Sequence, residues 1–393
     1  MPEEIAAAEY RRPNTEHRTP ACVHLNLQTF GVMCGFTTYA TELSLRLAEY
    51  SDIDTDIFYF SLRQRKNTWH YDFPIRHIHS LETFVFRDCS RRKLPDFRFM
   101  RPFVSFNFLT GGKSDDIYVF FDGKIPALPI KGRIIAAIHD MIPFRIQAGS
   151  MDRAIIAKNN EDLLRSEAVI ITVSEFSRQD IAEYFHIDPS RIHVVPNGVD
   201  PYKFSGDYDS GHITAKYGLP EKYILYFGSC GTHKNVESLV KSYALLPSAL
   251  RNEYRLVITN PSGSVKACAE ACGVSEQVQY LHKVPDEDKA GIYRGASVFV
   301  WPSLYEGFGI PILEAQASGV PVVSSNATSM PEVAGDSAIL VDPKDTEAIA
   351  SAIQKVLTDE ALHRDLVMKG FENIKRFSWD ESAKKLHDII VNI

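Results

Sequence analysis

Two glutamates and a pair of glycines stand close together between residues 301 and 314, and these residue types could bind and activate a ligand. The stretch reads Trp-Pro-Ser-Leu-Tyr-Glu-Gly-Phe-Gly-Ile-Pro-Ile-Leu-Glu. Glu306 precedes Gly307 and Gly309, and Glu314 follows them. Glycines let the backbone approach a ligand closely, and the unpaired N–H groups of a helix start favour an anion such as phosphate. The stretch is therefore predicted to bind a negatively charged group.

The residues on either side of this loop predict a strand before it and a helix after it. Residues 297–301 are apolar, as in a short buried strand, and Pro311 suits an early helix position. At helical spacing Glu314 shares a face with Leu313 and Ala317, which places a carboxylate on the packing side. Leaving it unpaired there would cost on the order of several kcal/mol. Glu314 is thus expected to have partners; the alternative is that it only complements the helix dipole.

Two loops elsewhere carry further residues suited to such a ligand. Lys234 follows a glycine-containing turn between an expected strand at 223–227 and an expected helix, a place that suits phosphate, although a surface lysine near a helix cap is the alternative. His139 ends an expected strand over residues 133–138, and the loop at residues 31–35 joins the first strand to the first helix. Doubly wound folds bind phosphates at such loops. An ordinary hydrogen-bonded histidine and an ordinary turn are the alternatives.

Strands alternate with helices along almost the whole chain, which predicts an α/β fold. With 393 residues the chain is more than twice a typical domain, and residues 196–211, rich in Pro, Gly, Asp and Ser, predict a linker. Alternation of this kind implies parallel sheets that bind ligands at the carboxyl ends of their strands. We therefore expect two doubly wound, Rossmann-like domains facing a central cleft. The strands are expected at residues 21–28, 57–61, 117–121, 133–138, 168–173, 192–195, 223–227, 255–259, 278–281, 297–301 and 320–324.

Composition narrows the class of partner. The net charge of -7 argues against nucleic acid as the main partner. The six cysteines show neither a disulfide framework nor a metal-binding spacing, which indicates a reducing compartment. Asp-x-Asp occurs at residues 54–56, 207–209 and 286–288, and a pattern repeated in this way is attributed to chance, so no metal is expected. Without a signal-peptide core or an apolar run of about 18 residues, the protein is predicted to be cytoplasmic.

Basic and aromatic residues alternate between residues 84 and 108. Such a mixture is found at anionic membrane surfaces and in sites for acidic acceptors. The alternative is a mobile loop whose aromatic rings pack on the domain and whose arginines are solvated. Peripheral contact with the inner face of the cell membrane is left open.

Taken together, these stretches resemble the retaining glycosyltransferases of family 4, which have the GT-B fold. The resemblance extends from Gly31 to Trp379 and is strongest at the Glu-x7-Glu of residues 306–314, at Gly-Val-Pro-Val-Val (319–323) and at Met-Pro-Glu-Val (330–333). Residues 138–143, 172–177, 195–199 and 377–379 support it. The most similar branch contains bacterial O-antigen and capsule mannosyltransferases.

The resemblance implies a role for each candidate residue. Glu314 would bind the ribose of a nucleotide, Glu306 the hydroxyls of the donor sugar, and His139 would reach the sugar from the first domain. Lys234 would hold the diphosphate together with backbone amides. Many relatives have an arginine at one of the positions that Ser229 and His233 occupy here, so the phosphate would depend more heavily on Lys234. The catalytic residues would be His139, Lys234 and Glu306, and the donor-binding residues Gly35, Ser229, His233, Lys234, Gly307, Phe308, Gly309, Ile310 and Glu314.

The function implied is retaining transfer of a hexose, with GDP-mannose as the favoured donor, to a glycan or lipid-linked saccharide in surface polysaccharide (lipopolysaccharide) synthesis. Neither a metal nor a cofactor would be needed. The expected parts are a flexible tail (1–20), an acceptor-side Rossmann-like domain (21–205), a nucleotide-sugar-binding domain (206–376) and a helix returning to the first domain (377–393). The alternatives are a non-catalytic nucleotide-sugar-binding protein and a sugar-nucleotide epimerase on the same fold. An epimerase would release nucleotide without an acceptor.

Overall fold

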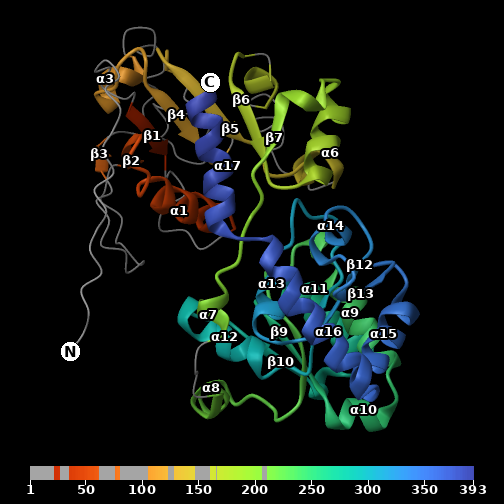
Figure 1. The fold of residues 1–393 in the computed structure, drawn as a ribbon. Coiled ribbons are helices and arrows are strands. Elements are labelled where there is room, and N and C mark those ends of the chain that lie inside the picture. Colours follow the sequence, from red (N-terminus) through yellow and green to blue (C-terminus); the bar gives the residue numbers. More distant parts are fainter. Residues whose placement is uncertain are drawn as a thin grey trace, which may run out of the picture.

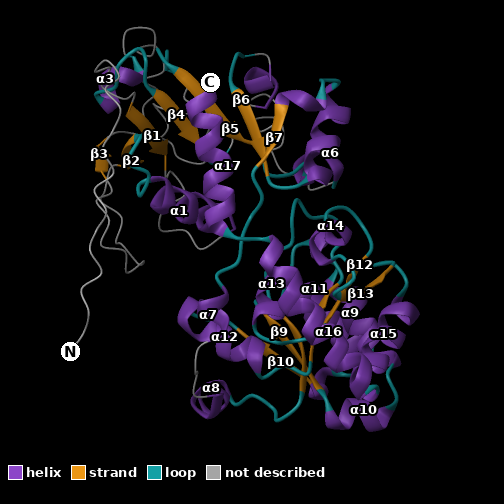
Figure 2. Ribbon diagram, in the orientation of Figure 1, coloured by secondary structure: helices purple, strands orange, loops and turns teal. Residues whose placement is uncertain are grey.

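The computed structural model describes residues 22–26, 35–61, 76–79, 105–122, 128–146, 160–164, 166–205 and 210–393. These residues form two α/β domains, one above the other in Figure 1, each with helices packed around a sheet (Figure 2). The chain passes from the first domain to the second after β7 and returns at the start of α17. The expected tail at residues 1–20, the loop at 31–34 and most of the basic-aromatic stretch lie outside the described residues.

The first domain contains a parallel sheet of seven strands in the order β3-β2-β1-β4-β5-β6-β7. All four residues of its strand β4 are buried, as expected for a central strand covered on both faces by helices. The strands are β1 (Cys22–Asn26), β2 (Asp54–Ser61), β3 (Arg76–His79), β4 (Ile117–Phe120), β5 (Arg133–Ala137), β6 (Val169–Thr172) and β7 (Ile192–Val194). The helices are α1 (Gly35–Leu47), α3 (Phe106–Thr110), α4 (Ile142–Arg145), α6 (Glu175–Phe185) and the 3-10 turn η2 (Pro189–Arg191).

The second domain contains a parallel sheet of six strands in the order β10-β9-β8-β11-β12-β13. Its strands are β8 (Tyr223–Tyr226), β9 (Arg255–Thr259), β10 (Val278–Leu281), β11 (Val298–Trp301), β12 (Val322–Ser325) and β13 (Ala338–Val341). The α-helices are α7 (Pro201–Ser205), α8 (Ser210–Tyr217), α9 (Val236–Leu245), α10 (Ser248–Glu253), α11 (Gly263–Ala271), α12 (Asp286–Arg294), α13 (Ile310–Ala317), α14 (Met330–Ala334), α15 (Thr346–Thr358) and α16 (Glu360–Asn373). The 3-10 turns are η3 (Thr232–Lys234), η4 (Ser275–Gln277) and η5 (Ile374–Arg376). Strands β8 and β11 are neighbours in the middle of this sheet.

The last helix, α17 (Trp379–Asn392), lies against α1 of the first domain (Figure 1). The Trp379 ring meets Tyr39 at 6.2 Å between centroids. Farther along, His387 stacks on Tyr50 at 4.1 Å and its Nε2 lies 2.9 Å from a carboxylate oxygen of Asp52. The C-terminal helix thus packs on the domain that begins the chain.

The structure corrects the expected linker, adds short elements and describes only part of one expected helix. The stretch expected as a linker contains the helix α7, in which Phe204 is buried, and the start of α8. It is tied to the end of the chain, because the N–H of Val199 donates to the carbonyl of Phe377 at 3.0 Å. The short elements β3, β13 and α14 were not foreseen, since four or five residues carry too little periodicity to be recognised. Of the helix expected at 152–165, only residues 160–164 are described, and they are helical.

Candidate functional site

Lys234 and Glu306 form an ion pair at the carboxyl ends of β8 and β11. The Lys234 Nζ lies 2.7 and 2.9 Å from the two carboxylate oxygens of Glu306. It also lies 4.7 Å from the centre of the Trp301 ring, a cation–π contact. The two side chains are only 15% and 9% exposed, so the lysine charge is held in a largely dry place beside one carboxylate. The structure therefore brings together two residues that are 72 positions apart in the sequence.

Backbone and amide contacts hold the two loops that carry this pair against each other. The N–H of Leu304 donates to the carbonyl of His233 at 2.7 Å. The Asn235 side chain donates to the carbonyl of Pro302 at 3.1 Å and to that of Pro343 at 2.7 Å. Asn235 has a left-handed backbone (φ 57°), which asparagine tolerates better than most residues. Both loops are thus fixed before any ligand arrives.

A buried serine clamps the glycine loop. The Ser329 hydroxyl lies 3.0 Å from the carbonyl oxygen of Glu306 and 2.7 Å from that of Phe308. Thr328 accepts the N–H of Glu306 at 3.1 Å. Gly309 has a φ of 116°, a conformation that requires glycine. The sequence analysis did not single out Ser329 or Thr328.

The N-terminus of α13 presents unpaired amides at this loop. Within the described part of the chain, no protein acceptor receives the backbone N–H of Phe308, Gly309 or Ile310. Pro311 stands at the first turn, as expected, and has no N–H to satisfy. Unpaired amides at a helix start form a site for an anion. The use of these amides for phosphate stays a prediction.

Glu314 lies on the buried face of α13 and has two partners on α12. Lys289 donates to one carboxylate oxygen, and the Tyr293 hydroxyl lies 3.1 Å from the other. Glu314 is 7% exposed, so its carboxylate is on the packing side and paired, as expected. The sequence analysis missed both partners. Lys289 and Tyr293 are four residues apart on a predicted helix, so the sequence indicates that they share one face of that helix. The sequence around them does not indicate that this face packs against Glu314.

His139 is buried at the end of β5 and is neutral. Its Nε2 lies 2.5 Å from the carbonyl oxygen of Phe121, which can only accept, so Nε2 carries the hydrogen. The ring packs against Phe36 and Tyr39, at 4.5 and 4.9 Å between centroids. Burial lowers the pKa of His139 to about 4, although the bond to Phe121 opposes this shift. The remaining ring nitrogen, Nδ1, is therefore an acceptor suited to a ligand hydroxyl.

Asp140, the next residue, brings a third charged group to the Lys234–Glu306 pair. Burial raises the pKa of the Asp140 carboxyl to about 6, and the nearby Glu306 carboxylate adds to this rise. The N–H of Ile142, which donates to Oδ1 at 2.9 Å, and the Lys234 charge both lower the pKa and so oppose the rise. Asp140 belongs to the first domain and the pair to the second. Asp140 lies within residues 138–143, which support the family resemblance, but the sequence alone predicts no role for it.

The other donor-site candidates have diverse surroundings. Ser229 is exposed, and its carbonyl accepts the Tyr226 hydroxyl at 2.6 Å. His233 is part-buried, and its pKa is lowered by burial and by the Lys234 charge. A Cβ added to Gly35 would meet no atom within 4 Å, so nothing in the described residues requires a glycine there. The close approach of Gly35 to phosphate remains a prediction.

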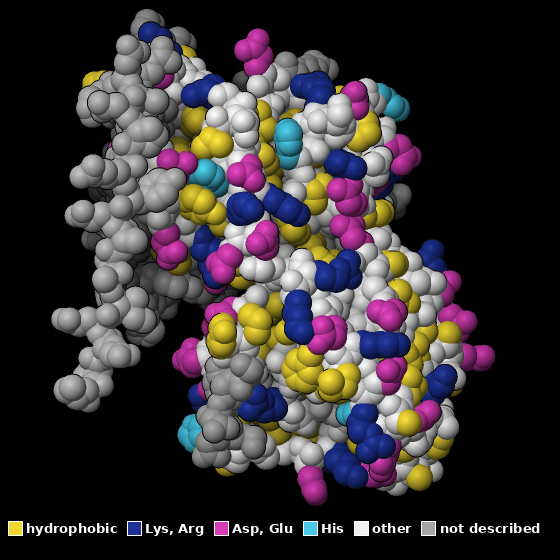
Figure 3. All heavy atoms as spheres, viewed as in Figure 1, with side chains coloured by type: hydrophobic (Ala, Val, Ile, Leu, Met, Phe, Trp, Pro, Cys, Tyr) yellow, Lys and Arg dark blue, Asp and Glu magenta, His cyan; other side chains and the backbone are white. Residues whose placement is uncertain are grey.

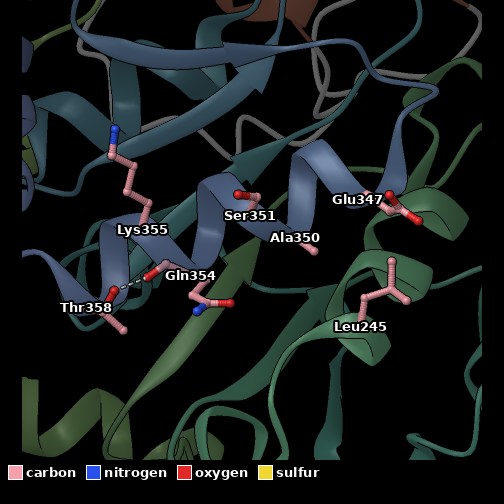
Figure 4. Close-up of a pocket in the computed structure, with 7 residues that line it drawn as sticks. All are labelled: Leu245, Glu347, Ala350, Ser351, Gln354, Lys355 and Thr358. Carbon is pink, nitrogen blue, oxygen red and sulfur yellow. Dashed lines mark hydrogen bonds between the residues drawn. The ribbon is translucent and has the colours of Figure 1, made fainter.

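The surface away from the site offers no comparable chemistry in the described residues. The depression in Figure 4, with a volume of about 560 Å³, lies along α15 and is lined by residues such as Glu347, Ser351 and Lys355. A second one of similar volume lies near Gly218 and Arg255. On the face in Figure 3 the acidic and basic side chains are interspersed. Among the described residues, no cluster of three or more His, Cys, Asp or Glu side chains could hold a metal, and no helix is long and apolar enough to cross a membrane.

Comparison with known proteins assigns the chain to a family. Residues 34–203 match the model described as Glycosyltransferase Family 4, and residues 212–373 match Glycosyl transferases group 1. O-antigen chain mannosyltransferase B of Escherichia coli is 36% identical over 261 residues, which cover 63% of this chain and 67% of that protein. The chain belongs to glycosyltransferase family 4.

A second relative agrees with the family 4 assignment, and two solved structures show the fold. Serotype-specific mannosyltransferase WbdA of Escherichia coli is 31% identical over 291 residues, which are 68% of this chain; the match spans only 36% of WbdA. Sucrose-phosphate synthase from Thermosynechococcus elongatus superposes with a TM-score of 0.74 at 19% identity, covering 95% of this chain and 99% of that one. Anabaena HepE in complex with UDP and glucose gives 0.69 at 15% identity, covering 95% and 100%. The fold is GT-B, as predicted.

Proposed function

We propose that this family 4 protein is a retaining, metal-independent glycosyltransferase that moves mannose from GDP-mannose to a glycan or lipid-linked saccharide in surface polysaccharide synthesis. The observation that carries the proposal is the Lys234–Glu306 pair, 2.7 Å apart, beside the unpaired amides at the start of α13. A cation, a carboxylate and a helix N-terminus match a diphosphate joined to a hydroxyl-rich sugar. Acceptor contact at the inner face of the membrane is part of the same proposal.

The proposed chemistry follows from where charge develops. Breaking the bond between sugar and phosphate leaves negative charge on the β-phosphate and positive charge on the sugar ring. Lys234 and the amides of residues 308–310 would stabilise the phosphate, and each charge-assisted hydrogen bond contributes about 1.5–3 kcal/mol. Front-face attack by the acceptor, with its proton passing to the leaving phosphate, would retain the configuration and need no enzyme nucleophile.

The remaining site residues divide between the nucleotide and the sugar. Glu314, oriented by Lys289 and Tyr293, would accept hydrogen bonds from the ribose hydroxyls. Glu306 and the Nδ1 of His139 would accept hydroxyls of the donor sugar. When a diphosphate binds, Lys234 would share its charge between the phosphate and Glu306.

The choice of donor rests on the relatives. Two of them are named mannosyltransferases, which favours mannose, and GDP is the nucleotide implied by the resemblance to that branch. HepE, a structural neighbour at 15% identity, was solved with UDP and glucose. Sugars linked to UDP should therefore be tested beside GDP-mannose as donors.

A panel of nucleotide sugars tests the proposal directly. Purified protein is screened for thermal stabilisation by GDP-mannose, UDP-glucose and UDP-N-acetylglucosamine, and nucleotide release is then followed with and without saccharide acceptors. We expect GDP-mannose to stabilise the protein most and release of GDP to require an acceptor. Release at full rate without an acceptor would indicate an epimerase, and tight binding with no turnover on any acceptor would indicate a binding protein.

Removing the lysine charge tests the role of the ion pair. Lys234→Ala should lower kcat by about 10²–10³-fold, the size of effect seen when one group stabilising a developing negative charge is lost. The fold should be kept, as measured by circular dichroism. Lys222→Ala is the matched control, because Lys222 pairs with Glu253 on the exposed surface. Near-normal turnover by the Lys234 variant would contradict the assignment.

A further inference from the structure

The carbonyl oxygen of Gly307, in the glycine loop of residues 306–309 (the donor loop), accepts hydrogen bonds from two serines of the other domain. The Ser174 hydroxyl lies 2.7 Å from it and the Ser177 hydroxyl 3.1 Å. Both serines are fully buried at the start of α6. They are also joined to each other, since the Ser177 N–H donates to the Ser174 Oγ at 3.0 Å. One carbonyl of the second domain is therefore surrounded by hydroxyls of the first.

Ser177 has a second acceptor within reach. Its hydroxyl lies 3.1 Å from the carbonyl oxygen of His139, which belongs to its own domain. A hydroxyl carries a single hydrogen, so Ser177 can donate fully to one of these two carbonyls at a time. If the domains separate, Ser177 retains His139 as its acceptor, while the Gly307 carbonyl passes to water. Ser177 therefore keeps a protein acceptor whether or not this contact is made.

The two backbones meet so closely that residue 307 has no room for a side chain. A Cβ on Gly307 would lie 2.5 Å from the His139 carbonyl oxygen and 2.8 Å from the Asp140 Cβ. Gly307 does not have a positive φ, so the glycine is required by this packing rather than by its own conformation. The donor loop and the segment that follows β5 thus touch directly across the two domains.

The orientation of this carbonyl also fixes the direction of the neighbouring amide N–H, which is predicted to bind phosphate. The peptide between Gly307 and Phe308 is planar and trans, so its N–H points opposite to its C=O. That N–H belongs to Phe308, one of the amides without a protein acceptor in the described residues. Holding the oxygen toward Ser174 and Ser177 therefore aims the amide away from the first domain, into the second.

We propose that Ser174 and Ser177 are positioning residues which fix the Gly307–Phe308 peptide when the domains close, so that the first domain completes the donor loop. This inference rests on the proposed function and adds to it a coupling between domain closure and turnover. Nucleotide binding, by contrast, would depend mainly on Glu314, Lys289 and the loop of Lys234, all in the second domain.

Serine-to-alanine variants test the coupling. Loss of two hydrogen bonds of about 1 kcal/mol each predicts that the Ser174→Ala/Ser177→Ala double variant loses about 20- to 30-fold in kcat with GDP-mannose and an acceptor. The affinity for GDP alone, measured by calorimetry, should fall by less than kcat does, because Glu314, Lys289 and Lys234 are unchanged and only the Phe308 amide loses its fixed orientation. Unchanged kcat, or equal losses in kcat and GDP affinity, would overturn the proposal.

Two further variants keep the result interpretable. Ser242→Ala is the matched control, because Ser242 is equally buried and donates to a backbone carbonyl at 2.7 Å within α9. A loss in kcat as large as that of the double variant would mean that any buried serine has this effect and would overturn the proposal. Ser174 also caps α6, so if the double variant folds poorly, Ser177→Ala alone carries the test, with an expected loss of about 5-fold.

A structural measurement separates this inference from the proposed function. X-ray scattering of the parent and of the double variant, each with GDP, reports closure without any turnover. We expect the parent to be the more compact of the two, and equal compactness would contradict the role of the serines. If instead no nucleotide sugar is turned over by the parent, the proposed function fails while the scattering comparison still decides the role of the serines.

Discussion

Glu306 in the donor loop and Glu314 in α13 differ in their neighbours, and so they should differ in their roles. Glu306 faces Lys234, with Asp140 of the other domain close enough to be influenced by both charges. Glu314 is held by Lys289 and Tyr293 on α12, within the second domain alone. Glu306 therefore has a charged neighbour in the first domain, whereas the hydrogen-bond partners of Glu314 lie in its own domain. We expect Glu306 to affect turnover and Glu314 to affect nucleotide binding.

Replacing each carboxylate by its amide tests this division. Glu306→Gln should lower kcat by at least about 10-fold with little change in GDP affinity, whereas Glu314→Gln should weaken GDP binding by about 10-fold, the value of one hydrogen bond to a charged group. Kinetics and calorimetry on the two variants give the comparison. Equal losses of both quantities in both variants would mean that the roles are not divided in this way.

Asp140 predicts a specific dependence of stability on pH. Its folded pKa, about 6, lies above the ordinary value of 3.8 for an aspartate, so its contribution to stability is fully present below pH 3.8 and is lost as the pH rises through 6. Asp140→Asn keeps an acceptor for the N–H of Ile142 and removes the titration. The parent loses this contribution as the pH rises and the variant does not. The unfolding temperature of the variant minus that of the parent should therefore increase between pH 4 and pH 7, the range that the two pKa values define. A difference that does not change with pH would contradict the raised pKa.

At the scale of elements, helix α6 has its first turn capped from both domains. Ser174 accepts the N–H of Ser177, and Glu332 of α14 accepts those of Glu175 and Phe176 at 2.9 and 3.0 Å. A negative charge near a helix N-terminus is also favoured by the helix dipole. The first turn of α6 is therefore complete only when α14 lies beside it.

Glu332→Ala should destabilise the protein by about 1 kcal/mol, the usual value of a lost helix cap. Hydrogen exchange of the amides of Glu175 and Phe176 should become faster at the same time. Glu372→Ala is the control, since Glu372 pairs with Lys375 at the exposed surface. If exchange at α6 is equally fast in both variants, Glu332 does not act as a cap across the domains.

At the scale of the whole molecule, α17 makes the stability of the first domain depend on the last residues of the chain. Its buried face includes Trp379 and Leu386, and Arg46 of α1 pairs with Asp380 at 2.5 Å. The adjoining strand-to-helix segment is packed tightly, because a Cβ on Gly198 would lie 2.5 Å from the backbone nitrogen of Trp379. The two segments in which the chain passes between the domains, after β7 and before α17, are thus in contact with each other.

Leu386→Ala should therefore destabilise the first domain by about 2–5 kcal/mol, as expected for a fully buried leucine. The effect should appear as faster hydrogen exchange in α1, with smaller changes in the strands of the second domain. Val391→Ala on the same helix, where the side chain is 50% exposed, should change the stability by less than about 0.5 kcal/mol. Similar effects of the two variants would show that α17 does not stabilise the first domain.

The sequence by itself determined the alternation of strands and helices, the parallel sheets, the glycine loop and the presence of a carboxylate on the buried face of α13. These features follow from local periodicity and from the backbone preferences of glycine and proline, which act within a few residues. The resemblance then supplied roles for His139, Lys234 and Glu306. Local patterns could not supply the partners of these residues.

Only the tertiary structure decided which side chains meet. Lys289 and Tyr293 reach Glu314 across two helices, Ser174 and Ser177 reach Gly307 from 130 or more residues away, and Asp140 faces a pair in the other domain. Periodicity tells which face of an element is buried, but the partner on that face depends on how sheets, crossovers and domains are packed. Charge and burial at the site therefore depend on the assembled fold and could not be read from any one stretch of the chain.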